Sequence, residues 1–422
     1  MVTRSSPAEQ RALPILQTVA PRLREPTPAG SVGAGHRAER PTRVTTPLED
    51  RHHAPAIAEW LDVLETTPLL ELGARADEVR RERHPEGRVT YIVDRNINYT
   101  NLCVTDCRFC AFYRRPRDAE AYVLSYEHIG RKIDEAKAVG AVQILMQGGH
   151  NPYLPLDWYL GLLRHIKEHH PIHVHGFSAS EIEMIAKVSR LPLDQVFRQL
   201  KEAGLDSMPG AGAEILVDSV RDVIAPKKID SGRWLEIHEV AHEAGLLTTA
   251  TMMYGVGEVW EDRLEHLLRL RETQNRSLAR GAGYFTAFIA WSFQPMQTEM
   301  QDWGLHLGTG MDYLRTTSLA RLVLDNFDNL QVSYVTQGPK MAQIALGFGA
   351  NDFGSLMIEE NVVSAAGIDF IMPESEIRRL IEDAGFTAHR RYQDYTRVTD
   401  TDTGCPCCEW RSALSVGGQG RA

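Results

Sequence analysis

Three cysteines in one short loop constrain this chain more than any other feature of its sequence. Cys103, Cys107 and Cys110 follow the spacing C-x3-C-x2-C, and an aromatic residue, Phe109, precedes the last of them. Thiolates are the usual ligands of iron–sulfur clusters, which normally take four of them. No further cysteine occurs between positions 114 and 404. The loop therefore predicts a 4Fe–4S cluster with one iron left open, and an open metal position usually serves chemistry, as it does in zinc enzymes.

Two other interpretations of the cysteine loop remain open. A zinc ion with a distant histidine as its fourth ligand is one, because the chain has 16 His, although no matching Cys/His pair follows downstream. Disulfides are the poorer one, since three clustered cysteines cannot all pair and we expect no secretory signal. The spacing favours the iron–sulfur cluster over zinc and over inert thiols.

The segments around the cysteine loop resemble those of radical S-adenosylmethionine (SAM) enzymes. The spacing with Phe109 is the signature of that superfamily. The lead-in at residues 96–101 and the turn Gln147-Gly148-Gly149 are similar to the two radical SAM enzymes of the futalosine route to menaquinone and to the radical SAM halves of deazaflavin (FO) synthase. The resemblance runs from about residue 50 to about residue 395. The segments that look most like one member, the cyclase of the futalosine route, are 210–218, 254–258, 293–295 and 359–364.

This resemblance implies a radical SAM cyclase that converts dehypoxanthine futalosine to its cyclic product in menaquinone biosynthesis. SAM would chelate the open iron, and one electron from a flavodoxin-type or ferredoxin-type donor would release a 5′-deoxyadenosyl radical, so that the cofactor supplies the hard chemistry. The radical would take hydrogen from ribose carbon 4′, and the new carbon radical would attack the benzoate ring. The aminofutalosine synthase and FO synthase reactions are the alternatives within the superfamily. A non-catalytic iron–sulfur carrier or sensor is the alternative from another class.

Strand-like and helical stretches alternate along the middle of the chain. Helices are predicted at residues 126–139, 156–169, 193–203, 233–244, 260–274 and 311–327, with Gly140 as a left-handed cap. Eight predicted strands alternating with helices favour an α/β fold of the (β/α)8 TIM-barrel type over an open doubly wound sheet. Apolar or β-branched runs predict the strands, at residues 90–94, 142–146, 172–177, 205–208, 247–254, 284–291, 332–335 and 345–348.

The loops after the predicted strands carry the polar and glycine residues that we expect at the site, because such loops converge on one face of a barrel. By the resemblance, Gly148 and Gly149 bind the methionine amino group of SAM, and the missing Cβ allows a close approach. The full set of cofactor-binding candidates is Phe109, Gln147, Gly148, Gly149, Ser178, Glu181, Gly255, Gly257 and Glu258.

Glu214 and His175 are the catalytic candidates, and the proton-accepting base of the reaction stays open between them and other residues. Glu181 and Glu214 could instead be ordinary helix N-terminal residues, which the helix dipole favours. His175 alternates with His173 on one face of a strand, where a hydrogen-bonded core histidine is the common outcome.

The benzoate carboxylate of the substrate needs a cation. Arg233, Lys227 and Lys228 are candidates, although a solvated surface position is favoured for the two lysines.

Composition agrees with a cytoplasmic enzyme that acts on a water-soluble, nucleoside-like small molecule. A chain of 422 residues can hold one large barrel or two ordinary domains. The net charge of −10 argues against a nucleic-acid-binding surface. No apolar stretch of membrane-spanning length occurs, so we expect no membrane span.

The two ends of the chain differ from the middle. Residues 1–45 combine seven Arg with three Glu and many Pro, without a sustained period, which predicts a disordered extension. Residues 46–398 are expected to form the barrel with its C-terminal elements. Residues 399–422 are predicted to be a flexible tail, whose Cys405, Cys407 and Cys408 are expected to be exposed thiols because neighbouring side chains diverge.

Overall fold

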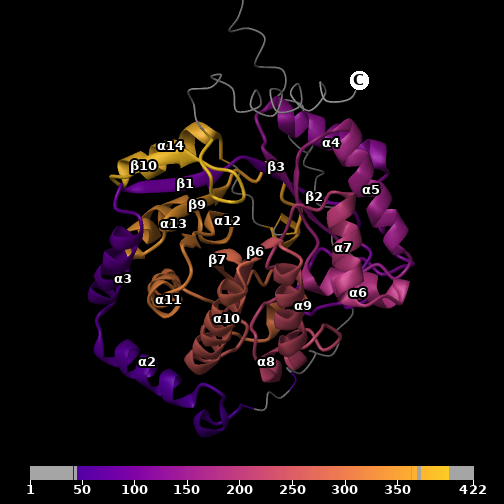
Figure 1. Cartoon of the computed structure of the whole chain (residues 1–422). Helices are drawn as coiled ribbons and strands as arrows, with labels where there is room; N and C mark the ends of the chain where they lie inside the picture. The colour runs from indigo at the N-terminus through magenta and orange to yellow at the C-terminus, as the bar shows by residue number, and fades with distance from the viewer. Residues whose placement is uncertain (1–40, 42–44, 363, 368–371, 399–422) are drawn as a thin grey trace, which may run out of the picture. The chain divides into compact units, whose positions relative to one another are not determined.

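The computed structural model of the protein describes residues 41, 45–362, 364–367 and 372–398. The expectations for most of the first 45 residues and for the tail with Cys405, Cys407 and Cys408 lie outside these residues. The described residues from Pro41 onward form one compact unit. In it, helices surround a parallel sheet (Figure 1).

Ten strands form this sheet, in the order β10-β1-β9-β8-β7-β6-β5-β4-β3-β2, and every neighbouring pair is parallel. A parallel sheet covered by helices is buried on both faces, and the apolar residues of β3, β6 and β7 suit this position. The strands are Arg88–Ile92 (β1), Asp94–Asn98 (β2), Gln143–Gln147 (β3), His173–Gly176 (β4), Ser207–Met208 (β5), Leu247–Tyr254 (β6), Phe285–Ser292 (β7), Asn329–Gln331 (β8), Asp352–Ser355 (β9) and Thr387–Arg390 (β10).

The strands β1 and β2 are one stretch of chain that brings the two ends of the sheet together. The first half pairs with β9 and β10, and the second half pairs with β3. The backbone N–H groups of Leu356 and Ile358 donate to the carbonyls of Ile92 and Asp94, at 3.0 and 3.3 Å, so the chain after β9 continues this contact. The sheet therefore returns on itself as an eight-stranded α/β barrel, with β10 added outside.

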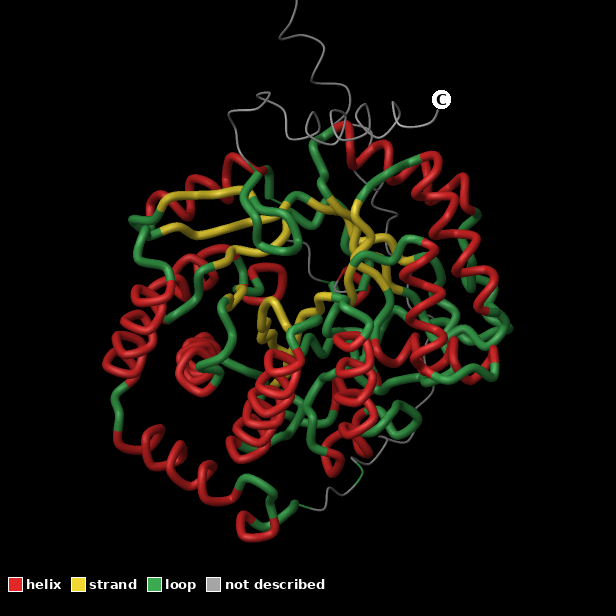
Figure 2. The backbone as a smooth tube through the Cα atoms, viewed as in Figure 1, coloured by secondary structure: helices red, strands yellow, loops and turns green. Residues whose placement is uncertain are grey.

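Most helices lie between successive strands and cover the outside of the barrel, as the red and yellow segments of Figure 2 show. A helix between two neighbouring parallel strands is the normal crossover connection. The helices are Ala54–Thr66 (α2), Leu69–Arg83 (α3), Tyr126–Ala138 (α4), Leu156–His169 (α5), Ala179–Ser189 (α6), Leu193–Ala203 (α7), Asp218–Ile224 (α8), Ser231–Glu243 (α9), Trp260–Arg280 (α10), Gly310–Val323 (α11), Tyr334–Gln337 (α12), Pro339–Ala345 (α13) and Glu374–Asp383 (α14).

The predicted barrel is confirmed, and most of the predicted elements are found within a few residues. The predicted helices at 156–169 and 193–203 and the strand at 247–254 have the observed bounds of α5, α7 and β6. Gly140 has a φ of +92°, as its predicted capping role requires.

Two predicted strands near the end of the barrel are wrong. Residues 345–348 form the end of α13 and a 3-10 turn, Leu346–Phe348 (η3), and the Phe348 ring lies against Gly73 of α3. The eighth strand of the barrel is β9 instead. Its sequence Asp-Phe-Gly-Ser gives little strand signal, because its stability comes from buried polar contacts such as that of Asp352 with Thr90, at 2.6 Å. Residues 332–335 lie after β8 and lead into α12.

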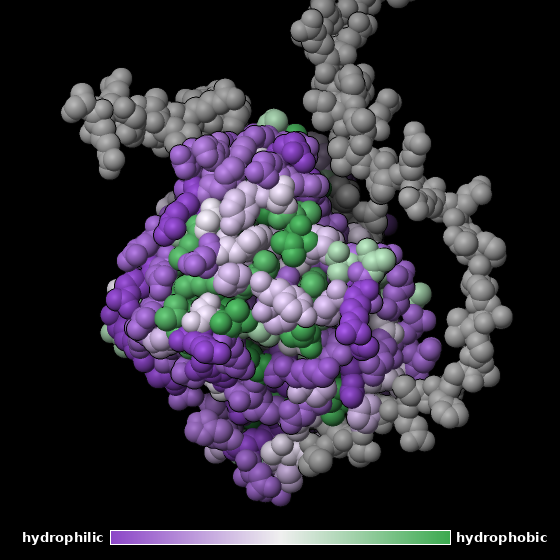
Figure 3. Space-filling model, turned by 90° about the vertical axis from the view of Figure 1, so that its right-hand side faces the viewer, coloured by the Kyte–Doolittle hydropathy of each residue, from purple (hydrophilic) through white to green (hydrophobic). Residues whose placement is uncertain are grey.

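The outer surface is mixed in polarity. On the face shown in Figure 3, hydrophilic residues form the rim and hydrophobic residues gather toward the middle. Within the described residues, no helix combines the length and the apolar character that crossing a bilayer requires.

Candidate active site

The cysteine loop follows β2 directly and borders a cavity of about 390 Å³ inside the barrel. Cys103, Cys107 and Cys110 all line this cavity. Cys103 and Cys107 are buried, and Cys110 is partly buried. The three thiols therefore lie together at the carboxyl ends of the strands, where barrel enzymes carry their sites.

Backbone hydrogen bonds fix the cysteine loop. Cys103 N–H donates to the carbonyl of Arg114 at 2.9 Å, and Cys110 N–H donates to the carbonyl of Cys107 at 3.1 Å. The hydroxyl of Thr105 lies 2.9 Å from Cys103 Sγ. Backbone bonds from Val104 N to the carbonyl of His150 and from Arg108 N to that of Ile224 tie the loop to neighbouring segments, so the three thiols are held beside the cavity.

The arrangement of the three thiols fits a cluster better than a single metal ion. Their sulfurs are not all within 4.8 Å of one another, since the one His/Cys/Asp/Glu group of the described residues that meets this limit is His52, His53 and Glu272. Two thiolates on one zinc ion, with bonds of about 2.3 Å, cannot lie more than about 4.6 Å apart. The described residues contain no fourth cysteine.

Burial makes the bare thiols poor anions. It raises the pKa of Cys107 to about 12, against a smaller opposing effect of Lys228, and it also raises the pKa of Cys110. Thiolates at this place need the positive charge of a bound metal, which deprotonates its thiol ligands.

The turn after β3 is packed too closely for any side chain. A Cβ on Gly148 would lie 2.5 Å from the Tyr99 ring, and a Cβ on Gly149 would lie 2.2 Å from the carbonyl oxygen of Leu102. Both glycines and Gln147 line the cavity beside the cysteines. The predicted turn is therefore in the place that a close backbone contact with a ligand requires.

Glu181 lines the cavity, but its carboxylate is engaged within the protein. It accepts hydrogen bonds from Tyr99 Oη at 2.6 Å, from Gly148 N at 2.8 Å and from Ser178 N at 2.7 Å. Ser178 and Glu181 form the capping box at the start of α6. Burial raises the pKa of Glu181, and these hydrogen bonds act against that effect. The structure thus gives Glu181 a part in positioning the glycine turn.

Glu214 and Lys228 form a buried ion pair next to the cysteine loop. The Lys228 side chain is only 10% exposed, so the surface position favoured from the sequence is wrong for this lysine. Burial lowers the pKa of Lys228, but the Glu214 and Cys107 charges outweigh it and raise that pKa overall. Glu214 has a φ of +44°, an uncommon conformation for a residue with a side chain.

The other two cation candidates lie outside the cavity wall. Lys227 is exposed and pairs with Asp106 at 2.8 Å. Arg233 pairs with Glu183 and Glu236.

His175 lies deep in the cavity. Its Nδ1 is 2.7 Å from Ser207 Oγ, which also contacts His173, and its Nε2 is 3.4 Å from Gln393 Nε2. Burial lowers the pKa of His175 well below its usual range, so its ring is neutral at pH 7. Both ring nitrogens have neighbours in the barrel, which agrees with the core role weighed from the sequence.

Gly255, Gly257 and Glu258 follow β6 but are not among the residues that line the cavity. The Glu258 carboxylate accepts from Gly255 N at 2.8 Å and pairs with Arg263 at 2.6 Å. In this structure the carboxylate of Glu258 stabilises its own loop.

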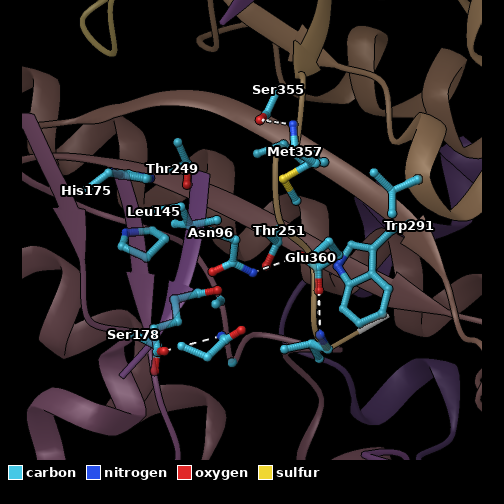
Figure 4. Close-up of a pocket in the computed structure, with 18 of the residues that line it drawn as sticks. Asn96, Leu145, His175, Ser178, Thr249, Thr251, Trp291, Ser355, Met357 and Glu360 are labelled. Carbon is cyan, nitrogen blue, oxygen red and sulfur yellow. Dashed lines mark hydrogen bonds between the residues drawn. The ribbon is translucent and has the colours of Figure 1, made fainter. Parts of the chain in front are cut away.

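Three residues without a predicted role, Asn96, Trp291 and Glu360, share one part of the cavity wall (Figure 4). Asn96 and Glu360 lie in segments that carry the family resemblance, but no spacing rule connects positions so far apart. Only the return of the sheet on itself brings them together, with Asn96 Nδ2 2.8 Å from Glu360 Oε2.

Two family models match the chain. The radical SAM superfamily model matches residues 97–270, and a model described as the CofH/MqnC C-terminal region matches residues 282–403. Together they cover the cysteine loop and the strands that complete the barrel.

Three curated relatives are similar over most of their length. A cyclic dehypoxanthine futalosine synthase of Halalkalibacterium halodurans is 46% identical over 81% of this chain and 90% of its own. One from Streptomyces coelicolor is 41% identical, over 82% and 86%. A 5-amino-6-(D-ribitylamino)uracil–L-tyrosine 4-hydroxyphenyl transferase of Methanococcoides burtonii is 40% identical, over 78% and 88%.

Solved structures share the fold. Methylornithine synthase (PylB) superposes with a TM-score of 0.60 at 17% identity, over 79% of this chain and 94% of its own. The [FeFe]-hydrogenase maturase HydG gives 0.59 at 16%, over 83% and 73%. At these identities the likeness extends to the barrel alone.

Proposed function

This chain belongs to the radical SAM superfamily of enzymes, and from that premise we propose that it converts dehypoxanthine futalosine to cyclic dehypoxanthine futalosine in menaquinone biosynthesis. The observation that carries the proposal is the 46% identity to a cyclase over 90% of that enzyme's length. The transferase relative, which is 40% identical, provides a defined alternative reaction that can be tested beside the first.

The proposal gives Cys103, Cys107 and Cys110 the role of holding one 4Fe–4S cluster whose fourth iron binds SAM. Supporting it are the spacing of the sulfurs, the three cysteines of the described residues and the position of all three beside the cavity. When bound, the cluster and SAM would supply a radical able to take hydrogen from an unactivated carbon. A flavodoxin-type or ferredoxin-type protein would supply the electron.

The residues of this chain would orient the substrate and keep water out. Buried Cys103 and Cys107 lie in a site where solvent has little access. Gly148 and Gly149 line the cavity, where their backbone would contact the methionine part of SAM, and Glu181 holds that turn through Gly148 N. The cavity also offers apolar walls, including Trp291 and Phe353, for an aromatic ring.

Substrate comparison tests this proposal. Reconstituted, reduced enzyme is given dehypoxanthine futalosine, the carboxyvinyl ether of aminofutalosine synthase, or tyrosine with the ribitylaminouracil, and products are identified by mass spectrometry. We expect turnover with dehypoxanthine futalosine only. Deuterium placed at its ribose carbon 4′ should appear in 5′-deoxyadenosine. Turnover only with one of the other two sets, or 5′-deoxyadenosine without deuterium, would move the enzyme to a related reaction.

A further inference from the structure

The side-chain amide of Asn96 carries an acceptor that lacks a partner. Asn96 is 1% exposed and lines the cavity, and its Oδ1 has no hydrogen-bond partner among the residues that the structure describes. Its Nδ2 donates to Glu360 Oε2 at 2.8 Å, and an ionised carboxylate only accepts, so the orientation of the amide is fixed. Buried polar atoms are normally satisfied, which points to a donor on a bound molecule.

An ion-pair network outside the barrel anchors the loop that carries Glu360. The neighbouring Glu359 pairs with Arg95 of β2 and with Lys132 of α4, each at 2.7 Å. Arg95 and Asn96 are consecutive in β2, so their side chains point to opposite faces of the strand. The loop therefore places Glu359 on the outer face of the barrel and Glu360 on the inner face.

Further hydrogen bonds fix the inner side of the same loop. Val362 N donates to Glu360 Oε1 at 2.7 Å, and Asn361 Nδ2 donates to Asn98 Oδ1 at 3.1 Å. Asn98, like Asn96, lines the cavity. The carboxylate of Glu360 is thus held in one position, as a group that orients a ligand should be.

The chemistry of this wall selects a ligand with hydroxyl groups beside an apolar face. In Figure 4, Glu360 lies between Asn96 and the indole of Trp291. Asn96 Oδ1 and the Glu360 carboxylate both accept, so they match donors and would repel an anion such as benzoate. The indole supplies the flat apolar surface that ligand pockets combine with a few fixed polar groups.

We infer that Asn96 and Glu360 form a hydroxyl-binding subsite that holds the ribose ring of the substrate and so sets which carbon faces the radical. This inference rests on the proposed function and adds the orientation of the substrate to it. A ribose also occurs in SAM. Asn96 lies on β2, which pairs with β3, the strand before the turn Gly148-Gly149. The subsite is assigned to the substrate because its other two residues, Glu360 and Trp291, belong to the β7–β9 side of the barrel, away from that turn.

Binding measurements on the cluster-loaded, unreduced enzyme test the subsite without turnover. In Glu360→Gln and Asn96→Ala, the Kd for dehypoxanthine futalosine should rise about tenfold or more, as expected for lost hydrogen bonds to a charged group. The Kd for SAM should change less than about twofold. The matched control is Glu135→Gln, which removes an outer partner of Arg95 that is 67% exposed, and it should bind both ligands like the wild type.

Analogues of the substrate that each lack one ring hydroxyl complete the test. The wild type should bind at least one analogue about tenfold more weakly than the substrate. Glu360→Gln should bind that analogue and the substrate almost equally, because the missing hydroxyl and the missing carboxylate are partners in the wild-type complex. Additive losses, or a loss of SAM affinity instead, would overturn the subsite. The wild type alone supplies the analogue result if a variant is poorly folded. Absence of wild-type turnover overturns the proposed function, whereas turnover with an unchanged Kd in Glu360→Gln overturns the subsite alone.

Discussion

The ammonium of Lys228 lies 5.5 Å from the centre of the Phe109 ring. This contact connects the aromatic residue of the cysteine loop to the buried Glu214–Lys228 ion pair. A cation at this distance from an aromatic face is attracted to it, more strongly when water is excluded. The pair therefore packs against the loop that carries the thiols, and removing either charge should change the packing of that loop.

Replacing Lys228 by Met should destabilise the protein strongly. The Glu214 side chain is 5% exposed and would remain as a buried charge without its cation, which typically costs about 3–5 kcal/mol. Urea denaturation should show this loss in the free energy of unfolding. Adding Glu214→Gln should restore a large part of it. A single variant as stable as the wild type would contradict the burial of this pair.

Gly149→Ala should prevent cluster assembly. The added Cβ would lie 2.2 Å from the backbone carbonyl of Leu102, next to Cys103, so the cysteine loop must move. We expect iron per chain after reconstitution to fall to a small fraction of the wild-type value. The control is Gly347→Ala, because nothing lies within 4 Å of a Cβ at that position. Full iron loading of Gly149→Ala would show that the loop tolerates the shift.

Cys107→Ala should abolish both the cluster spectrum and SAM cleavage. In the proposed cluster three irons each need one thiolate ligand from the protein, and this variant supplies only two. Iron analysis and electron paramagnetic resonance of the reduced protein, with and without SAM, measure the effect. Retained SAM cleavage would contradict the role of Cys107 as a cluster ligand.

Removal of the tail beyond Val398 should leave iron per chain unchanged. Cys405, Cys407 and Cys408 are too close together in sequence to reach separate irons well. A loss of about four irons on truncation would show a second cluster in the tail.

Stability should fall as the pH drops from 6.5. Burial lowers the pKa of His242 and of His266 from 6.5 to about 3. Between these values the unfolded chain binds a proton at each ring that the folded protein does not bind, so stability rises with pH in this window. Each ring contributes about 1.4 kcal/mol per pH unit. His242→Gln should reduce the slope of unfolding free energy against pH by that amount, and an unchanged slope would contradict the burial effect.

The barrel was predictable because local patterns specify most of its strands and helices. Apolar patterns bounded by proline or glycine give α5, α7 and β6 directly. The pattern fails at β9, where Asp352 is buried and paired with Arg391, a residue from beyond β10. A strand whose stability depends on such distant polar contacts carries no local signal.

The candidate site was predictable only where its residues are close in sequence. The three cysteines and the turn Gly148-Gly149 are short motifs, and their positions follow from the strands before them. Lys228 looked like half of an exposed Lys-Lys pair, and only the fold shows that it turns inward while Lys227 turns outward. Glu360 meets Asn96 only when the sheet returns on itself.

The return of the sheet on itself also sets an order of events during synthesis. Asp94 and Ser355, which are hydrogen-bonded in the barrel, lie 261 positions apart in the chain. At about 5–20 residues per second, the ribosome needs on the order of ten seconds to a minute between the two. The cysteine loop is therefore synthesised well before β9, the strand that completes the barrel around it. If the three thiols hold the proposed cluster, we expect iron and sulfide to be delivered after chain completion, with a reducing environment keeping the nascent thiols free until then.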